Sequence, residues 1–482
     1  LTKDGEVWIA TSRNGLIRFN HGSRQQLTAS SGLLVDDIPV LYEDRESNIW
    51  VGSNGAGLHR LRKKVLRTIS TRDGLPINDV VCLVQDQSGI PWIGTWGEGA
   101  GVWKDGRFSR LPDLPSAGVN VLSMHATAGG TVWVGDGDGV LYRCQNGGVI
   151  QRERIPGQGT RTVFEDRDGG LWLGSRDRGV QRRQEARVTY FRPSDGLSHA
   201  YVTCIAQDKQ GAIWIGTKQG LNRIEAGKIQ QFHRADGLGA DPIHTLYPDQ
   251  AGALWIGTAG GGLTRYLDGR FTTVTTRHGL VNDVVAQIVE DDYGYVWIGT
   301  NAGLMRVLRG DLESCLEGKS SEIHGVVLAR TEGMLSPECA GSHQPACFKA
   351  RDGQLWFATV GGIVIVDPAK LATNALPPPV RVEYVRTEAD VTPAASDPSG
   401  QPSEIIVPPG RERLEIGYTA LSFPAPDRVR FRYRLGGWDK AWVEAGAQRS
   451  AYYTKVRPGA YRFQVIACNN DGVWNDIGAT LS

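Results

Sequence analysis

The sequence has few cysteines, no long apolar run and no excess of charge of either sign. It contains 7 cysteines among 482 residues, none in a Cys-x-x-Cys spacing, so we expect no zinc site. It has no run of about eighteen apolar residues, the length that a membrane-spanning helix requires. Lys and Arg number 53 against 52 Asp and Glu, with the two signs interspersed. This balance argues against a nucleic-acid partner.

The cysteines leave one question of redox chemistry open. Cys339 and Cys347 are close enough in sequence to form a disulfide in an oxidising compartment. The alternative is that they are small buried apolar residues. No motif points to a catalytic centre, so we expect no catalytic residues, no metal and no cofactor.

A tryptophan phrase recurs nine times along the chain. Each copy has a turn residue, an apolar residue, Trp, a second apolar residue, and then Gly or Ala. The repeated residues are Trp8, Trp50, Trp92, Trp133, Trp172, Trp214, Trp255, Trp297 and Trp356. The steps between them are 39 to 42 residues, except for a last step of 59. A fixed period near forty residues with a strand-like local pattern is typical of a β-propeller.

Residues 78–110 show how one repeat is expected to fold. VVCLVQD, IPWIGT, GVWKD and RFSRL read as four strands, with tight turns at DQSG and DG. Four antiparallel strands make one propeller blade. We interpret the repeated Trp as packing between blades, and the Asp before each first turn as a turn cap rather than a catalytic carboxylate. These aspartates are Asp44, Asp86, Asp166, Asp208, Asp249, Asp292 and Asp352.

The chain after the repeats has a different pattern. PPPV (377–380) reads as an extended spacer and residues 391–403 as a polar loop. The segments that follow alternate apolar and polar residues with a period of two. We predict a small antiparallel β-sandwich of the immunoglobulin or fibronectin kind.

These motifs resemble a known family. The WIGT and GL repeats resemble the two-component regulator propeller family, and ECAG (338–341) with QPA (344–346) resembles its closing blade. The tail resembles the three-tyrosine (Y_Y_Y) domain that follows such propellers, with Tyr433, Tyr452 or Tyr453, and Tyr461 matching its tyrosines. The resemblance implies the periplasmic sensor region of an inner-membrane hybrid histidine kinase or diguanylate cyclase.

Nine repeats fit neither one nor two seven-bladed rings, the arrangements that the resemblance implies. Counting back seven tryptophans from Trp356 reaches Trp92. We therefore predict an all-β chain with a seven-bladed propeller at 70–372, remnant blades of a preceding propeller at 1–69, and a C-terminally truncated three-tyrosine sandwich at 373–482. A single ring of eight or nine blades is the alternative.

The two ends of each blade differ in their loops. The DxxG and DG turns lie on one face and are nearly uniform, whereas the loops after WIGT lie on the opposite face and vary between copies. Variable loops on a rigid scaffold are where binding residues are expected. We therefore place a ligand on the second face or at the mouth of the central channel.

Several residues of the variable face are candidates for ligand contact. Trp96, in a variable loop beside Glu98, suits stacking on a sugar ring, unless it packs on the neighbouring blade. Trp103 is the other propeller tryptophan outside the repeated phrase. Arg176 and Arg178 can clamp an anionic group, unless they belong to a solvated run of charges.

Histidines near the inter-blade loops complete the candidate set. His199, His244 and His343 leave a metal site open, although nothing in their spacing requires one. The candidate ligand-binding residues are Trp96, Glu98, Trp103, Arg176, Arg178, His199 and His343.

The leading hypothesis is an extracytoplasmic ligand-sensing region of a bacterial transmembrane signalling protein. Its ligand is a small molecule, for which the resemblance suggests an oligosaccharide, and its signal passes through the sandwich to a kinase or cyclase. We expect a homodimer through the three-tyrosine domain, and contact with the membrane only through a helix outside this chain. The alternatives are a propeller enzyme (a lyase, a glycosidase or a quinoprotein) and a protein-interaction scaffold.

Overall fold

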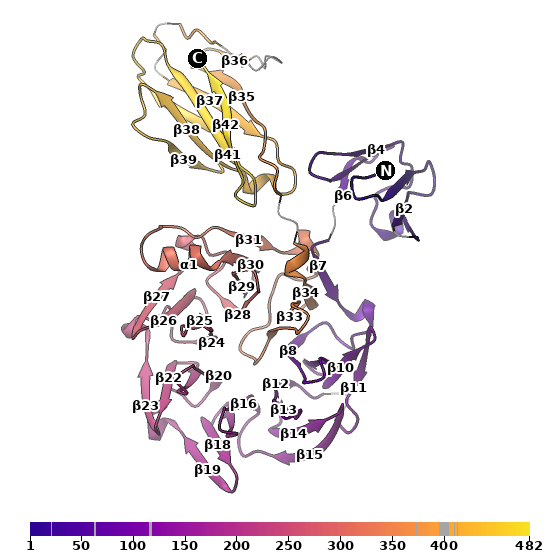
Figure 1. Cartoon of the computed structure of the whole chain (residues 1–482), viewed down its shortest axis with the longest axis vertical. Coiled ribbons are helices and arrows are strands. Elements are labelled where there is room, and N and C mark those ends of the chain that lie inside the picture. The colour runs from indigo at the N-terminus through magenta and orange to yellow at the C-terminus, as the bar shows by residue number, and fades with distance from the viewer. Residues whose placement is uncertain are drawn as a thin grey trace. The chain divides into compact units, whose positions relative to one another are not determined.

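The structure is a computed structural model that describes residues 1–20, 22–61, 64–114, 118–371, 374–394, 404–408, 410–411 and 413–482. The chain divides into two compact units, Lys64–Leu371 and a second unit that combines Leu1–Lys63 with Ala372–Ser482. Both consist of antiparallel β-sheets (Figure 1), so the predicted all-β class is confirmed.

The described residues of Lys64–Leu371 form a ring of seven four-stranded blades. The first strands of neighbouring blades contact one another around the centre, as Figure 1 shows for most of the ring. We number the blades from one to seven, starting with β8. The strands of blades one to seven are β8 (Val80–Gln85), β9 (Pro91–Thr95), β10 (Ala100–Lys104), β11 (Arg107–Arg110); β12 (Val121–Ala126), β13 (Val132–Asp136), β14 (Val140–Gln145), β15 (Gly148–Arg154); β16 (Thr160–Glu165), β17 (Leu171–Ser175), β18 (Val180–Gln184), β19 (Arg187–Phe191); β20 (Val202–Gln207), β21 (Ile213–Thr217), β22 (Gly220–Glu225), β23 (Lys228–Phe232); β24 (Ile243–Pro248), β25 (Leu254–Thr258), β26 (Leu263–Leu267), β27 (Arg270–Val274); β28 (Val285–Glu290), β29 (Tyr295–Thr300), β30 (Gly303–Leu308), β31 (Gly325–Leu328); β32 (Cys347–Lys349), β33 (Leu355–Thr359), β34 (Gly362–Val366) and β7 (Leu66–Ile69).

Blade seven joins the two ends of the ring. Its outer strand, β7, comes from the start of the unit and pairs antiparallel with β34 from the end, in a register that sets Ile69 opposite Ile363 and Leu66 opposite Val366. The range 70–372 that we predict for the propeller therefore omits the strand that completes the last blade. Sequence periodicity centred on the tryptophans does not reveal this strand, because β7 and its partner lie at opposite ends of the ring's sequence.

The repeated tryptophans of the ring pack between blades, as the sequence indicates. Trp92, Trp214, Trp255 and Trp297 are almost fully buried. The Gly two residues after most of these tryptophans allows the next blade to approach: a Cβ at Gly216 would lie 2.8 Å from a side-chain carbon of Ile243 in the next blade.

Six of the turn aspartates have a second bond that the sequence analysis did not anticipate; Asp352, only four residues before Trp356, is not one of them. Besides capping its turn, the carboxylate accepts a hydrogen bond from the indole N–H of the Trp six residues later, at 2.7–2.9 Å. The pairs are Asp44–Trp50, Asp86–Trp92, Asp166–Trp172, Asp208–Trp214, Asp249–Trp255 and Asp291–Trp297. The prediction of Asp292 is wrong by one residue, because Asp291 caps that turn and Asp292 pairs instead with Lys349 at 2.6 Å.

A non-repeating segment enters the centre of the ring. The plug, which we define as residues 338–346, precedes β32 and is hydrogen-bonded to the first strands of several blades. Leu83 N–H donates to the Pro345 carbonyl at 2.8 Å, and Met124 N–H to the Gln344 carbonyl at 3.1 Å. The Gln344 side-chain oxygen accepts from Ile205 N–H at 2.6 Å and from the Thr162 hydroxyl at 2.8 Å. The plug is therefore fixed across the channel rather than free in it.

The long last repeat interval has two causes. It contains α1 (Arg309–Leu316), inserted between β30 and β31, as well as the plug. Short 3-10 helices occupy other loops of the chain: η1 (Ala29–Ser31), η2 (Thr71–Asp73), η3 (Pro193–Asp195), η4 (Arg234–Asp236), η5 (Thr276–His278), η6 (Arg330–Glu332), η7 (Pro368–Lys370) and η8 (Pro426–Arg428).

The second unit contains small N-terminal sheets and the C-terminal sandwich. Within its described residues, the N-terminal segment forms a pair of three-stranded sheets, and the C-terminal segment forms a pair of four-stranded sheets. In sheet order the strands are β1 (Val7–Ala10), β2 (Leu16–Asn20), β3 (Ser23–Leu27); β4 (Val40–Glu43), β5 (Ile49–Ser53), β6 (Gly57–Leu61); β36 (Val391–Pro393), β35 (Val380–Arg386), β37 (Arg413–Ala420), β40 (Ser450–Thr454); β39 (Val443–Gly446), β38 (Arg430–Gly436), β41 (Arg462–Cys468) and β42 (Trp474–Leu481).

The sandwich settles details that the sequence left open. Tyr453 is buried and its hydroxyl donates to Asp439 at 2.8 Å, whereas Tyr452 is 67% exposed, so Tyr453 is the core tyrosine. The centre of the Tyr453 ring lies 6.2 Å from the centre of the Tyr433 ring. Residues 474–481 form β42 and pair with β41. Of the predicted loop 391–403, residues 391–393 form β36, and residues 395–403 lie outside the described residues.

Candidate functional site

The candidate site lies on the variable face, where the inner strands of blades three and four begin. Arg161 is the second residue of β16, and Tyr201 immediately precedes β20. Arg176 and Lys218 immediately follow β17 and β21, in the variable loops. We call the following group the mouth cluster: Arg161, Arg176, Tyr201, Lys218 and the plug residue His343.

Three cationic side chains surround the ring of Tyr201. The Lys218 ammonium lies 4.2 Å from the ring centre, the Arg161 guanidinium carbon 4.9 Å and that of Arg176 5.9 Å. All three distances are within the range of a cation–π contact. Among the described residues, no carboxylate forms an ion pair with any of these three cations. The surroundings of Tyr201 therefore have an uncompensated positive charge.

Arg161 connects this positive charge to the plug. Its side chain is only 7% exposed, and one terminal nitrogen donates to the Ser342 carbonyl at 2.6 Å. Its Nε is buried without a hydrogen-bond partner among the described residues. Burial lowers the pKa of this guanidinium, and the charge of Arg176 lowers it further, against an opposing effect of Tyr201. Arginine keeps its proton in this setting, so a buried positive charge remains with donor capacity unused.

His343 adds a hydrogen-bond acceptor to the cluster. Its Nδ1 lies 2.8 Å from the Gly341 carbonyl, while its Nε2 is buried without a partner among the described residues. Burial lowers the pKa of His343 to about 3, with a further contribution from the charge of Arg161. The imidazole is therefore neutral near pH 7. Because Nδ1 faces a carbonyl and must donate, Nε2 presents a lone pair.

Carboxyl groups on the same face lie in other loops. Asp79 immediately precedes β8, and Glu338 begins the plug. Burial raises the pKa of Asp79, and the charge of Glu338 raises it further. The variable face therefore combines a positive region around Tyr201 with a separate pair of acidic groups.

The predicted site residues divide into two groups in the structure. Trp96 is 44% exposed and its ring lies edge-on to His343, with 6.1 Å between ring centres. His199 Nδ1 accepts from the Tyr201 N–H at 2.9 Å. Together with Arg176, these residues lie at or beside the mouth cluster.

The other predicted residues lie away from the mouth cluster or are already bonded. Trp103 is 9% exposed and packs in the core between blades one and seven, so it presents little surface to a ligand. Glu98 forms an ion pair with Arg110. Arg178 is exposed, and its backbone N–H donates to the Ser175 hydroxyl at 2.7 Å.

Arg161, Tyr201 and Lys218 were missed by the sequence analysis. Lys218 stands in a loop that we recognise as variable, but a single lysine there gives no distinguishing signal. Arg161 had a usable signal, because it interrupts an otherwise uncharged start of an inner strand, TRT at 160–162. A charged residue at such a position must find a special environment.

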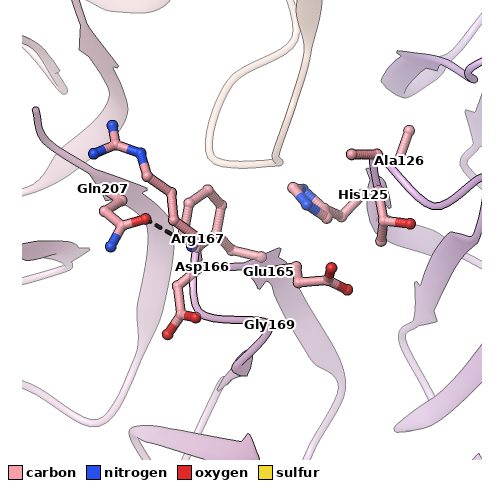
Figure 2. A pocket seen from close by; sticks show the side chains of 10 residues that line it. His125, Ala126, Glu165, Asp166, Arg167, Gly169 and Gln207 are labelled. Carbon is pink, nitrogen blue, oxygen red and sulfur yellow. Dashed lines mark hydrogen bonds between the residues drawn. The ribbon is translucent and has the colours of Figure 1, made fainter. Parts of the chain in front are cut away.

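A cavity lies at the opposite end of the inner strands from the mouth cluster (Figure 2). It has a volume of about 400 Å³ and is lined by His125, Ala126, Thr127, Ala128, Phe164, Glu165, Asp166, Arg167, Gly169 and Gln207. Several of its polar groups are already bonded: Asp166 accepts from Trp172, and Arg167 donates to the Lys209 carbonyl and, through its N–H, to Gln207. The mouth cluster, by contrast, retains unpaired donors and an acceptor, and we therefore regard it as the better binding site.

The question of metals and disulfides can be addressed for the described residues. Within them, no three His, Cys, Asp or Glu side chains are grouped so that they could hold a metal ion. Cys339 and Cys347 are free thiols, and burial raises the pKa of each to about 12. No helix in the described part of the chain is long and apolar enough to cross a membrane.

Family models match two regions of the chain. The two-component regulator propeller model matches residues 196–219, 237–260 and 279–302, and the Y_Y_Y domain model matches residues 422–482. The histidine kinase P4 of Formosa agariphila is 22% identical over 162 residues, which are 32% of this chain and 11% of the kinase. The chain therefore corresponds to a small part of that relative's length.

Two solved structures from B. thetaiotaomicron are similar in fold. One is the extracellular domain of a protein assigned as a hybrid two-component system, with a TM-score of 0.77 and 22% identity, covering 99% of this chain and 66% of that one. The other, the extracellular domain of a protein assigned as a one-component system, has a TM-score of 0.50 and 17% identity and covers 100% of this chain and 67% of that one. The chain therefore contains repeats that match the two-component regulator propeller model and a C-terminal segment that matches the Y_Y_Y domain model.

Proposed function

We propose that this chain is the extracytoplasmic sensing region of a bacterial signalling protein, which binds a small molecule at the mouth of its seven-bladed propeller. The observation that carries the proposal is the mouth cluster, where unpaired polar groups from blades three and four meet a fixed plug. The propeller repeats followed by a Y_Y_Y domain, and the extracellular domains that share this fold, support it. An oligosaccharide suits the site, because Trp96 offers an exposed ring for stacking.

The relay to a kinase or cyclase belongs to the same proposal. A ligand can shift a signalling equilibrium only if it binds one arrangement of the protein more tightly than another. The sandwich, acting as a homodimer contact, is the element through which such a difference would reach the partner domains. Sequencing the DNA that flanks this region tests the relay: a membrane helix followed by kinase or cyclase motifs supports it, and a flanking sequence without them contradicts it.

Ligand binding is tested by thermal shift. A panel of neutral and charged oligosaccharides in large excess over the dissociation constant should raise the melting temperature, since a ligand that binds only the folded state stabilises it by about 2.7 kcal/mol at a hundredfold excess. Trp96→Ala should weaken this response while leaving the melting temperature of the free protein nearly unchanged. The exposed Trp438→Ala in the sandwich is the matched control.

The outcome separates the proposal from its rivals. If Trp96→Ala instead loses most of its thermal stability, Trp96 packs on the scaffold and does not bind a ligand. If no compound of the panel shifts the melting temperature, the protein-interaction scaffold becomes the better explanation. Turnover of a panel compound would favour a propeller enzyme.

A further inference from the structure

We propose that the mouth cluster recognises an anionic group, a carboxylate or a sulfate, on the small ligand. The anionic group would lie among the cations around Tyr201, and His343 would accept a hydrogen bond from a neighbouring hydroxyl of the ligand. This inference rests on the proposed function, because it assigns the chemistry of the ligand that the mouth binds.

Three positive charges are gathered around Tyr201. Arg161 and Arg176 come from blade three and Lys218 from blade four, and all three lie within 6 Å of one ring centre. Gathering like charges is unfavourable, and an exposed cation–π contact returns only about 0.5–1 kcal/mol. An anion placed among the three cations would relieve their repulsion.

The Arg161 side chain lies almost buried beside the plug. A nearly buried arginine is normally paired with a carboxylate or fully hydrogen-bonded. Here one terminal nitrogen is bonded to Ser342, and Nε has no partner among the described residues. A carboxylate or sulfate oxygen is the acceptor that a guanidinium fork binds best.

Acceptor groups on the same face limit how much negative charge the ligand can carry. His343 supplies a lone pair at Nε2, which accepts from a hydroxyl but repels an anionic oxygen. Asp79 and Glu338 also lie on loops of this face. These carboxylates would repel a polyanion such as nucleic acid. They would not repel a hydroxyl-rich molecule whose single anionic group binds among the cations. The combination fits an acidic sugar.

The experiment is isothermal titration calorimetry on the whole chain at constant ionic strength. The probes are trigalacturonate, which is carboxylated, a sulfated trisaccharide, neutral maltotriose, and inorganic sulfate. We expect the wild-type chain to bind at least one of the two charged trisaccharides about tenfold or more tightly than maltotriose. The two charged probes then distinguish a carboxylate from a sulfate.

Variants locate the binding site. The double variant Arg176→Gln with Lys218→Gln changes only exposed side chains, so the fold should be retained, and the affinity for the charged trisaccharide should fall about tenfold for each cation removed. Arg192→Gln is the matched control, because Arg192 stacks on Tyr190 at 4.7 Å, away from the mouth cluster. The Arg192→Gln variant should bind the charged trisaccharide with the same affinity as the wild-type chain.

The results that overturn the inference differ from those that overturn the proposed function. The anion is rejected if neutral and charged trisaccharides bind equally well and the double variant does not change their affinity. In that case the proposal that the mouth binds a ligand still stands. Failure of both charged trisaccharides to bind also rejects the anion. Binding of inorganic sulfate alone shows that the cations attract free anions without recognising a sugar, and it too rejects the inference. The proposed function fails separately, in the thermal-shift panel.

Discussion

The hairpin β20–β21 of blade four has two ends with different chemistry. At the turn between the strands, the Asp208 carboxylate accepts from the Ala212 N–H at 2.9 Å and from the Trp214 indole at 2.7 Å. At the open end, Tyr201 and Lys218 face a group of cations that lack carboxylate partners among the described residues. The turn end of these two strands thus carries a satisfied polar group that stabilises the fold, whereas the residues at the open end lie among cations without carboxylate partners in the described part of the chain.

Substitutions at the turn end should therefore affect stability, and substitutions at the mouth end should affect binding. The turn end repeats through most blades, so its residues serve the scaffold. The mouth end is specific to blades three and four and to the plug. The predictions below test this division, from the largest expected effect to the smallest.

Asp208→Ala should destabilise the chain most. It leaves two donors, the Ala212 N–H and the Trp214 indole N–H, buried without acceptors, at a cost of about 1–3 kcal/mol each. Urea denaturation measures the loss in free energy of unfolding. The exposed Asp476→Ala is the matched control, and equal stability of the two variants would show that the Asp–Trp bond contributes nothing.

Gln344→Leu should have a smaller effect on stability. It removes the acceptor of the Ile205 N–H and of the Thr162 hydroxyl, and we expect a loss of roughly 2–3 kcal/mol. Hydrogen exchange at Ile205 should become faster, because its N–H loses its protection. An unchanged exchange rate would mean that the plug is not fixed through Gln344. Substitution of the exposed Gln219 by Leu provides the control.

Thr127→Asp should stabilise blade two. Trp133 is the member of the repeat whose indole N–H is buried without a partner among the described residues, and the Nε of Arg143, opposite it on β14, is in the same state. In blade three, Asp166 accepts from both the Trp172 indole and Arg182 Nε, at 2.7 and 2.9 Å. An Asp at position 127, six residues before Trp133, supplies the same acceptor.

The expected gain for Thr127→Asp is about 1–2 kcal/mol in the free energy of unfolding. Thr127→Asn is its control, because it keeps the size and lacks the charge. A Thr127→Asp variant that is less stable than the wild-type chain would contradict the equivalence of the blades.

The last prediction concerns the dependence of stability on pH rather than the effect of one substitution. Burial lowers the pKa of His125 to about 4, and burial with the charge of Arg161 lowers that of His343 to about 3. Below about pH 6.5 the unfolded chain binds protons that these folded residues do not, so the stability should fall as the pH drops toward 4. The slope is at most about 1.4 kcal/mol per pH unit for each histidine.

Single variants show how much of this pH dependence of the unfolding free energy comes from the turn end of the ring and how much from the mouth. His125 lines the cavity near the turns and His343 belongs to the mouth. His125→Gln and His343→Gln should each flatten the dependence of unfolding free energy on pH. If neither does, other groups cause the acid sensitivity.

The sequence was sufficient for the repeating part of the fold. Spacing of the tryptophans predicted four-stranded blades, and the period-two tail predicted the sandwich, because both patterns are local. The bond from Asp to Trp was missed, although its six-residue spacing is visible in the sequence. The mouth cluster was predicted only in part: Trp96, Arg176 and His343 stood out in their loops, whereas Arg161 and Tyr201 gain their meaning from contacts between blades and with the plug.

The pairing of β7 with β34 has a mechanical consequence. The chain enters β7 at Leu66 and leaves β34 at Val366, and these two residues are directly opposite each other. Both links to the rest of the chain therefore leave from one end of one strand pair. A force that separates the two links would open this pair like a zipper, one hydrogen bond at a time, instead of shearing all of its bonds together. Blade seven is thus the joint at which the ring yields first to tension.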